Sequence, residues 1–192
     1  MHYLLKRFIV FVLLCCLPAI SFAENKEFYG RSIPLTVVME ESNETLTLRG
    51  VALSKHFFED DYIGAFYSQN TVLDAKAALA DMGPKRMVFY FLRSNDHFRE
   101  QLESAIEENN SPQMVQREQI NISQLLKIFD RPLREGDIVI LDYIPKVGMR
   151  IILRGTVNVV IKDTEIYNLV LKSWMGRQPP SKKFRKDLFN LT

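Results

Sequence analysis

The sequence predicts an α+β fold in which helices pack on one face of an antiparallel sheet. Apolar residues alternate over 33–67 and again over 136–162, which is the pattern of β-strands. Segments with one-sided apolar spacing, typical of amphipathic helices, lie mostly between and after these strands. Because the strands cluster at both ends of the chain and are joined by tight turns, we expect one sheet with its helices collected on one side.

The first predicted strands cover residues 33–39 and 45–53, after a polar segment, 24–32, that is expected to be loose. In the second strand the alternation slips: Leu46 and Leu48 share one parity, whereas Val51 and Leu53 have the other. A bulge or kink at Gly50 would bring all four side chains to one face.

Two further strands are predicted around the acidic run Glu59-Asp60-Asp61. If Asp60 and Asp61 are the central residues of a tight hairpin, Ser54 faces Tyr67 with Cβ atoms about 5 Å apart. Asp adopts the positive φ of such turns less readily than Asn-Gly, so a register shift of one residue stays open. A solvated turn is a simpler interpretation of the three acids than a cation site.

Helices and strands complete the chain in an order that supports one domain. A helix over 71–83 ends at Gly83 as its C-cap, and another starts at Asn121, with Gln124 completing a capping box. The last core helix is capped by Asp163 or Thr164 and stops at Gly176. The other elements are a strand over 86–93, a helix over 94–110, strands over 136–145, 148–155 and 157–162, and a basic amphipathic helix over 181–189.

Residues 1–23 have the three-part layout of a secretory signal peptide. Two basic residues precede an apolar run over 8–17, and a small-x-small cleavage site ends at Ala23. A membrane anchor is the competing interpretation, but the run is too short to span a bilayer and Pro18 interrupts it. We therefore expect an exported protein, periplasmic if the source is a Gram-negative bacterium.

Cleavage after Ala23 changes the composition of the chain. It leaves 169 of 192 residues, about right for one domain, with 23 basic against 23 acidic side chains and no net charge. The balance gives no reason to expect nucleic acid as a partner. Cys15 and Cys16 are both removed with the signal peptide, so the domain can form no disulfides and must be stabilised by its hydrophobic core.

Familiar catalytic motifs are absent from the sequence, and no cofactor is expected. His56 and His97 lack a second ligand at metal spacing, and there is no phosphate loop, dinucleotide fingerprint or nucleophile elbow. The basic stretch 182–186 could touch lipid head groups, but a solvated terminal helix is the simpler interpretation.

Several weak motifs occur in a fixed order along the chain. They are Gly50, Phe57-Phe58, Tyr62, Phe66-Tyr67, Gly136-Asp137, Pro145 with Gly148, Gly155, Ile161 and Trp174-Met175-Gly176. In this order and spacing the chain resembles the bacterial chalcone isomerase-like family of exported proteins. The resemblance covers about residues 45–190, which divides the mature chain into an N-terminal segment with the first strand, 24–44, and a chalcone isomerase-like domain, 45–192.

The resemblance implies an open-faced layer, a curved antiparallel sheet with helices over one face and a ligand cleft between them. Plant enzymes of the family close a chalcone to a flavanone with the help of an arginine, and related plant proteins bind fatty acids through an arginine and a tyrosine. The position of the arginine falls on Ser54 and that of the tyrosine on Tyr67. Arg49 and Lys55 have the wrong parity to replace the arginine, and only a bulge would bring Lys55 round.

The resemblance therefore favours a non-catalytic domain that binds a fatty acid or other apolar small molecule, with Tyr67 and Ser54 as ligand contacts. An intramolecular lyase or isomerase and a partner-binding protein of the cell envelope are the alternatives. Tyr67 also has a purely structural interpretation, as a core aromatic whose hydroxyl is satisfied internally. Trp174 is expected to anchor the last helix rather than to contact a ligand.

Overall fold

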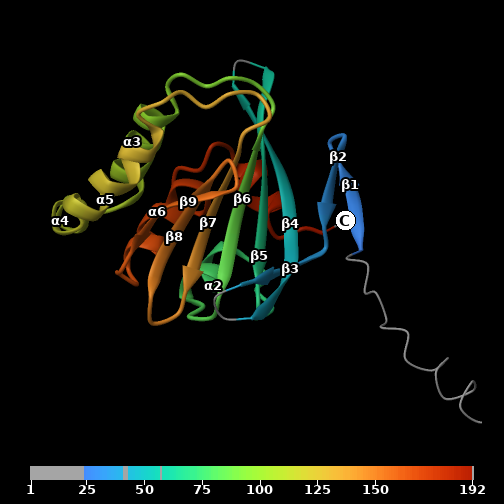
Figure 1. Cartoon of the computed structure of the whole chain (residues 1–192), viewed down its shortest axis with the longest axis horizontal. Coiled ribbons are helices and arrows are strands. Elements are labelled where there is room, and N and C mark those ends of the chain that lie inside the picture. Colours follow the sequence, from blue (N-terminus) through green and yellow to red (C-terminus); the bar gives the residue numbers. More distant parts are fainter. Residues whose placement is uncertain (1–23, 41–42, 57, 192) are drawn as a thin grey trace, which may run out of the picture.

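The computed structural model describes residues 24–40, 43–56 and 58–191 (Figure 1). The predicted signal peptide, 1–23, lies outside this range. The strands are β1 (Asn25–Phe28), β2 (Arg31–Pro34), β3 (Thr36–Met39), β4 (Glu44–His56), β5 (Glu59–Ser68), β6 (Lys85–Phe91), β7 (Ile138–Ile144), β8 (Gly148–Leu153) and β9 (Thr156–Ile161). The helices are α2 (Ala75–Ala80), α3 (Phe98–Asn109), α4 (Pro112–Arg117), α5 (Gln119–Leu126), a 3₁₀ turn (Lys127–Phe129), α6 (Ile166–Met175) and α7 (Lys182–Asp187).

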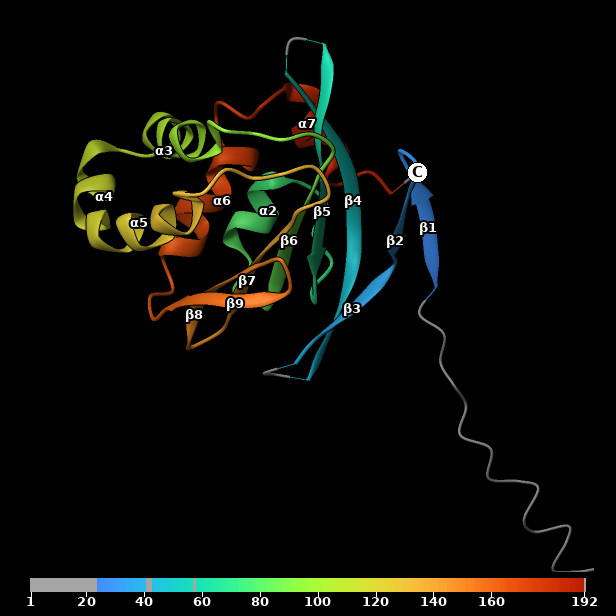
Figure 2. The same ribbon diagram turned by 45° about the horizontal axis from the view of Figure 1, so that its top comes forward.

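Seven strands form one antiparallel sheet in the order β3-β4-β5-β6-β7-β8-β9. The sheet curls, and α2, α6 and α7 lie on one side of it, with α3, α4 and α5 beyond its edge (Figures 1 and 2). The short hairpin β1–β2 forms a second, separate sheet. This arrangement confirms the predicted α+β fold with a curved antiparallel sheet and helices on one face.

Each face of the sheet carries its own apolar cluster. The helix-side cluster joins the sheet to every one of the larger helices, with Phe89 of β6 and Trp174 of α6 near its centre. The opposite cluster gathers the other side chains of β4 and β5 under Ile33 of the β1–β2 hairpin. The prediction that segment 24–32 is loose is wrong. This segment is ordered because β1 pairs with β2, and the pairing places Ile33 in a fully buried position.

The slip in the β4 pattern is a β-bulge, as predicted. The register moves between Leu48 and Gly50, and Leu46, Leu48 and Val51 consequently share the cluster opposite the helices. Gly50 has a second role, since an added Cβ would lie 2.2 Å from the carbonyl oxygen of Asp187. The close approach of α7 to β4 thus requires glycine at this position.

Several predicted boundaries are wrong at the ends of elements. The predicted strand 33–39 is divided at Leu35, so its halves belong to different sheets. Helix α2 has Asp81 as its C-cap, not Gly83. Helix α5 begins at Gln119, so Asn121 lies inside the helix, where its amide donates to Glu118, and no capping box forms.

The last core helix stops where its sequence predicts, but its N-cap is Glu165, not Asp163 or Thr164. The Asp163 carboxylate still accepts hydrogen bonds from the backbone N–H groups of Glu165 and Ile166, and Gly176 is the C-cap. Among the described residues, no helix is long and apolar enough to cross a membrane.

Candidate ligand-binding cleft

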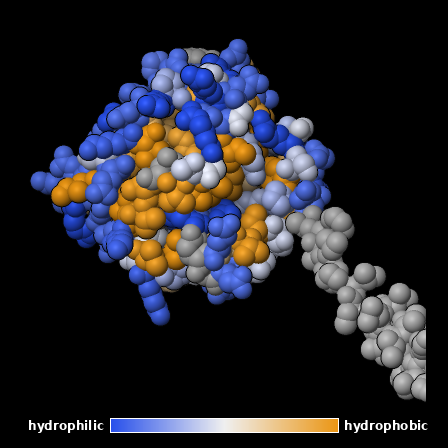
Figure 3. Space-filling model, viewed as in Figure 1, coloured by the Kyte–Doolittle hydropathy of each residue, from blue (hydrophilic) through white to orange (hydrophobic). Residues whose placement is uncertain are grey.

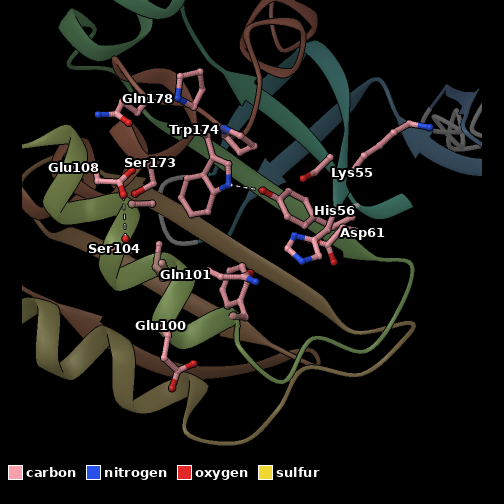
Figure 4. Close-up of a pocket in the computed structure, with 17 residues that line it drawn as sticks. Lys55, His56, Asp61, Glu100, Gln101, Ser104, Glu108, Ser173, Trp174 and Gln178 are labelled. Atoms are coloured by element: carbon pink, nitrogen blue, oxygen red, sulfur yellow. Dashed lines mark hydrogen bonds between the residues drawn. The ribbon is translucent and has the colours of Figure 1, made fainter. Parts of the chain in front are cut away.

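A cleft of about 540 Å³ opens on the helix side of the sheet, between the end of the β4–β5 hairpin, α3 and the C-terminal end of α6 (Figure 4). Its apolar walls come from Phe98, Leu102 and Ala105 of α3, from Trp174, and from Pro179 and Pro180. Its polar groups come from all sides: Ser54, Lys55, His56, Asp61 and Tyr62 of the hairpin, Glu100, Gln101, Ser104 and Glu108 of α3, and Ser173 and Gln178 at the end of α6. The cleft therefore combines apolar side chains with many polar groups, a composition suited to an amphiphilic small molecule.

Three buried side chains meet at the sheet side of the cleft. Ser54 lies directly across from Tyr62. The indole Nε1 of Trp174 donates to the Tyr62 hydroxyl at 3.0 Å (Figure 4). Burial raises the pKa of Tyr62 to about 12, against the opposing effect of the Ser54 and Trp174 side chains. Tyr62 is therefore protonated at neutral pH.

Aromatic rings hold this group in place. Tyr62 makes edge-on contacts with Phe89 and Phe184 at centroid distances of 5.5 and 5.9 Å. Phe89 in turn stacks on Trp174 at 4.4 Å. Rings at these distances contribute beyond their buried area and restrict one another's rotation, so the polar group is rigid.

A second bulge brings an acid into the cleft. The register shifts between Ser54 and Lys55, which leaves Asp61 as the extra residue of β5. Asp61 and Tyr62 consequently both line the cleft, although neighbours in a regular strand point to opposite faces. Burial raises the pKa of Asp61, while Arg93, His56 and a hydrogen bond from Asn95 act to lower it.

The predicted turn is wrong, and with it the expectation that all three acids lie in the turn. The strands pair out to His56 and Glu59, so the chain reverses before the acids, where Phe58 has a φ of 71°. Glu59 and Asp60 are exposed and form ion pairs with Arg93 and Lys55. Asp61 is buried.

The predicted pairing of Ser54 with Tyr67 is also wrong. Ser54 faces Tyr62, five positions from the expected partner, and an odd shift moves a side chain to the other face of the sheet. Tyr67 faces Leu48 in the cluster opposite the helices and donates its hydroxyl to the carbonyl of Pro34 at 3.0 Å. The structure places Ser54 in the cleft and Tyr67 on the other face, so the two cannot contact one ligand from the same side.

Lys55 is among the residues that line the outer end of the cleft, and its side chain extends away from Trp174 (Figure 4). Its Nζ lies 2.9 Å from the Asp60 carboxylate, and its side chain is 57% exposed. Arg49 lies at the other end of β4 and donates to Ser68 and Gln69. Lys55 is thus the nearer of the two cations to Ser54.

Sequence reasoning missed Asp61 and Ser173 as cleft residues. Ser173 precedes Trp174 on α6, lines the cleft, and is buried with a hydroxyl that has no hydrogen-bond partner. Its position on the apolar face of an amphipathic helix was a signal available in the sequence. Trp174 anchors α6 as predicted and lines the cleft as well. No group of acids, histidines or cysteines in the described part of the chain could hold a metal ion.

Comparison with known proteins agrees with this architecture. A sequence model of the chalcone isomerase-like family matches residues 25–190. The chain belongs to the chalcone isomerase-like family. The match begins within β1, so it includes the N-terminal segment as well as the domain expected from residue 45. No curated protein sequence matches the chain.

Solved structures share the fold of this chalcone isomerase-like protein. One is the crystal structure of a fatty-acid binding protein from Arabidopsis thaliana, with a TM-score of 0.55 and 13% sequence identity. The similarity covers 80% of this chain and 95% of the other.

Proposed function

We propose that the protein is a non-catalytic binding domain that holds a fatty acid or another apolar small molecule in the cleft between the β4–β5 hairpin and α3. One observation carries this proposal: the cleft joins an apolar wall to buried, neutral hydrogen-bonding groups, in a fold shared with a plant fatty-acid binding protein.

The polar end of the cleft indicates what kind of head group fits. Ser54 and Ser173 offer neutral hydroxyls, and the buried Asp61 would repel a carboxylate placed beside it when ionised. Lys55, at the rim, is the cation that an acid could reach. We therefore expect a fatty acid to bind with its chain against Phe98, Leu102 and Ala105 of α3 and its carboxylate toward the rim. An uncharged amphiphile should reach the Ser54 end.

The same groups support binding rather than catalysis. Stabilising a developing oxyanion is usually the largest contribution to catalysis of this kind, and a serine offers one weak hydrogen bond where an arginine offers a charged, two-pronged contact. With a pKa of about 12, the hydroxyl of Tyr62 is almost fully protonated at neutral pH, so its base form is too scarce to act as a general base.

Trp174 provides a direct test, because it is the single tryptophan of the chain and lies in the cleft. Titration of the delipidated protein with cis-parinaric acid, a fluorescent fatty acid, should quench Trp174 emission with saturable, one-to-one behaviour. Solvent extraction and mass spectrometry of the protein as purified should detect a lipid-like molecule. A protein that is empty after purification and gives no saturable quenching would refute the proposal.

A variant whose side chain fills the cleft tests whether the ligand binds there or at another surface. Ala105→Phe places a ring in the cleft from α3 and should abolish the quenching. Ala77→Phe, which adds the same ring at an exposed position of α2 outside the cleft, is the matched control and should titrate like the parent protein.

A further inference from the structure

A second groove, on the helix layer, combines an apolar floor with a basic rim. It lies between α2, the end of α6 and α7, with a volume of about 1070 Å³. The floor is formed by Ala75, Leu79, Met175 and Phe189, and the exposed Leu73 also lines the groove. We call this surface the basic groove.

Five cations surround the basic groove: Lys76, Arg177, Lys182, Arg185 and Lys186. Arg185 donates to the Gly176 carbonyl at 2.7 Å, whereas Lys76, Lys182 and Lys186 are exposed and form no ion pair within the described part of the chain. Asp74 is the one acid among the lining residues, and its carboxylate caps α2 by accepting from the Ala77 N–H. The groove, with five cations and one acid, is therefore strongly positive on a chain whose net charge is only +2.

The apolar side of the groove is open to water. Leu73 is 80% exposed, in the turn that leads into α2. A small inorganic anion would use the lysines but leave Leu73 in water, and an uncharged apolar ligand would cover Leu73 but leave the lysines unused. A surface that offers negative charge and apolar chains together satisfies both groups.

We propose that the basic groove docks on an anionic phospholipid bilayer, with the lysines against the phosphate groups and Leu73 inserted at the interface. This interaction goes beyond the proposed ligand binding and does not depend on it. The chain between Gly176 and Pro180 borders both the groove and the cleft, so a docked bilayer lies beside the binding site.

Vesicle co-sedimentation tests the docking. The purified protein should bind vesicles of phosphatidylcholine and phosphatidylglycerol (7:3) and stay in the supernatant with phosphatidylcholine alone. Binding should weaken by about tenfold or more between 50 and 500 mM salt, because the lysine–phosphate attraction is screened. Equal binding to both vesicles, or no dependence on salt, would overturn the proposal.

Variants locate the contact. Lys76→Gln/Lys182→Gln/Lys186→Gln should lower vesicle affinity on the order of 100-fold, at about fivefold for each charge removed. The charge-matched control Lys127→Gln/Arg131→Gln/Lys146→Gln, at exposed positions outside the groove, should stay within about twofold of the parent. Leu73→Ser should weaken binding about fivefold with an unchanged salt dependence.

A triple variant that binds like the parent would overturn the proposal, as would loss of vesicle binding in the control. Capture of an acidic polypeptide, tested with polyglutamate, in preference to anionic vesicles would assign the groove to a protein partner instead. Thermal melting of each variant confirms that these surface changes leave the fold intact.

Discussion

The indole Nε1 of Trp174 donates a hydrogen bond of 3.0 Å to the hydroxyl of Tyr62, joining α6 to β5 across the helix–sheet interface. Both side chains are buried, and the buried Ser54 of β4 lies directly across from Tyr62. This contact fixes the wall of the cleft and links residues that are 112 positions apart in the sequence.

Tyr62→Phe should therefore destabilise the protein by about 1–3 kcal/mol, because it leaves the buried indole N–H without a partner. Trp174→Phe should also destabilise it, whereas the double variant should lose less than the two single losses combined. Urea unfolding of all four proteins measures this coupling. Additive losses would show that the hydrogen bond contributes nothing.

Asp142→Asn should cost about 3–5 kcal/mol, since it leaves the buried guanidinium group of Arg150 and the largely buried one of Arg86 without their carboxylate. Arg86 reaches Asp142 at 2.6 and 3.0 Å and Arg150 reaches it at 2.5 and 3.0 Å, with the carboxylate fully buried. The control is Asp60→Asn, which breaks the exposed pair with Lys55 and should cost less than about 1 kcal/mol. Similar losses for the two variants in urea unfolding would contradict the assignment.

The stability of the protein should rise with pH between about 8 and 10. Lys85 is buried, with its Nζ 2.8 Å from the Ala78 carbonyl oxygen and 5.3 Å from the ring centroid of Tyr143, and burial lowers its pKa to about 8. The unfolded chain keeps this proton up to a pKa near 10.5, so it binds more protons in this window and folding gains on the order of 2 kcal/mol.

Above about pH 10 the trend should reverse. The unfolded chain then ionises its tyrosines, while Tyr62 stays protonated up to a pKa of about 12. Lys85→Met should remove the rise between pH 8 and 10 and keep the fall above pH 10, which urea titrations at a series of pH values would measure. A rise that persists in Lys85→Met must come from another group.

Ser54→Arg should strengthen binding of a fatty acid relative to the corresponding fatty alcohol by about tenfold, since it adds a charged contact for the carboxylate. The parent protein should distinguish the acid from the alcohol only weakly. Ser54→Ala is the control, with an expected change below about threefold for either ligand. Quenching of Trp174 gives both affinities, and an arginine variant with no preference for the acid would place the carboxylate elsewhere.

Export predicts a defined mature N-terminus. Expressed with its first 23 residues in a Gram-negative host, the protein should be recovered from the periplasm beginning at Glu24. Intact-mass measurement of the periplasmic fraction tests this, with Ala23→Asp as the variant that should block cleavage. A full-length protein in the cytoplasm or membrane would favour the anchor interpretation.

Local patterns in the sequence predicted the elements whose cause is local. The parity slip around Gly50 identified the first bulge, and Gly176 marked the end of α6, because bulges and caps depend on residues close in the chain. The segregation of strands and helices was sufficient to predict the α+β class, and the order of the weak motifs was sufficient to predict the family.

Only the tertiary structure decided which residues meet in the cleft. The register of β4 with β5 depends on where the turn falls and on a second bulge at Asp61, which no local pattern marked. Because side chains alternate between faces, an odd error in register exchanged Tyr67 for Tyr62 opposite Ser54. The sequence by itself determined the fold class and the family. The packing of α6 and α7 on one face decided that Ser54, Tyr62 and Trp174 meet beside the cleft, since burial on that face selects one register from several that alternation allows.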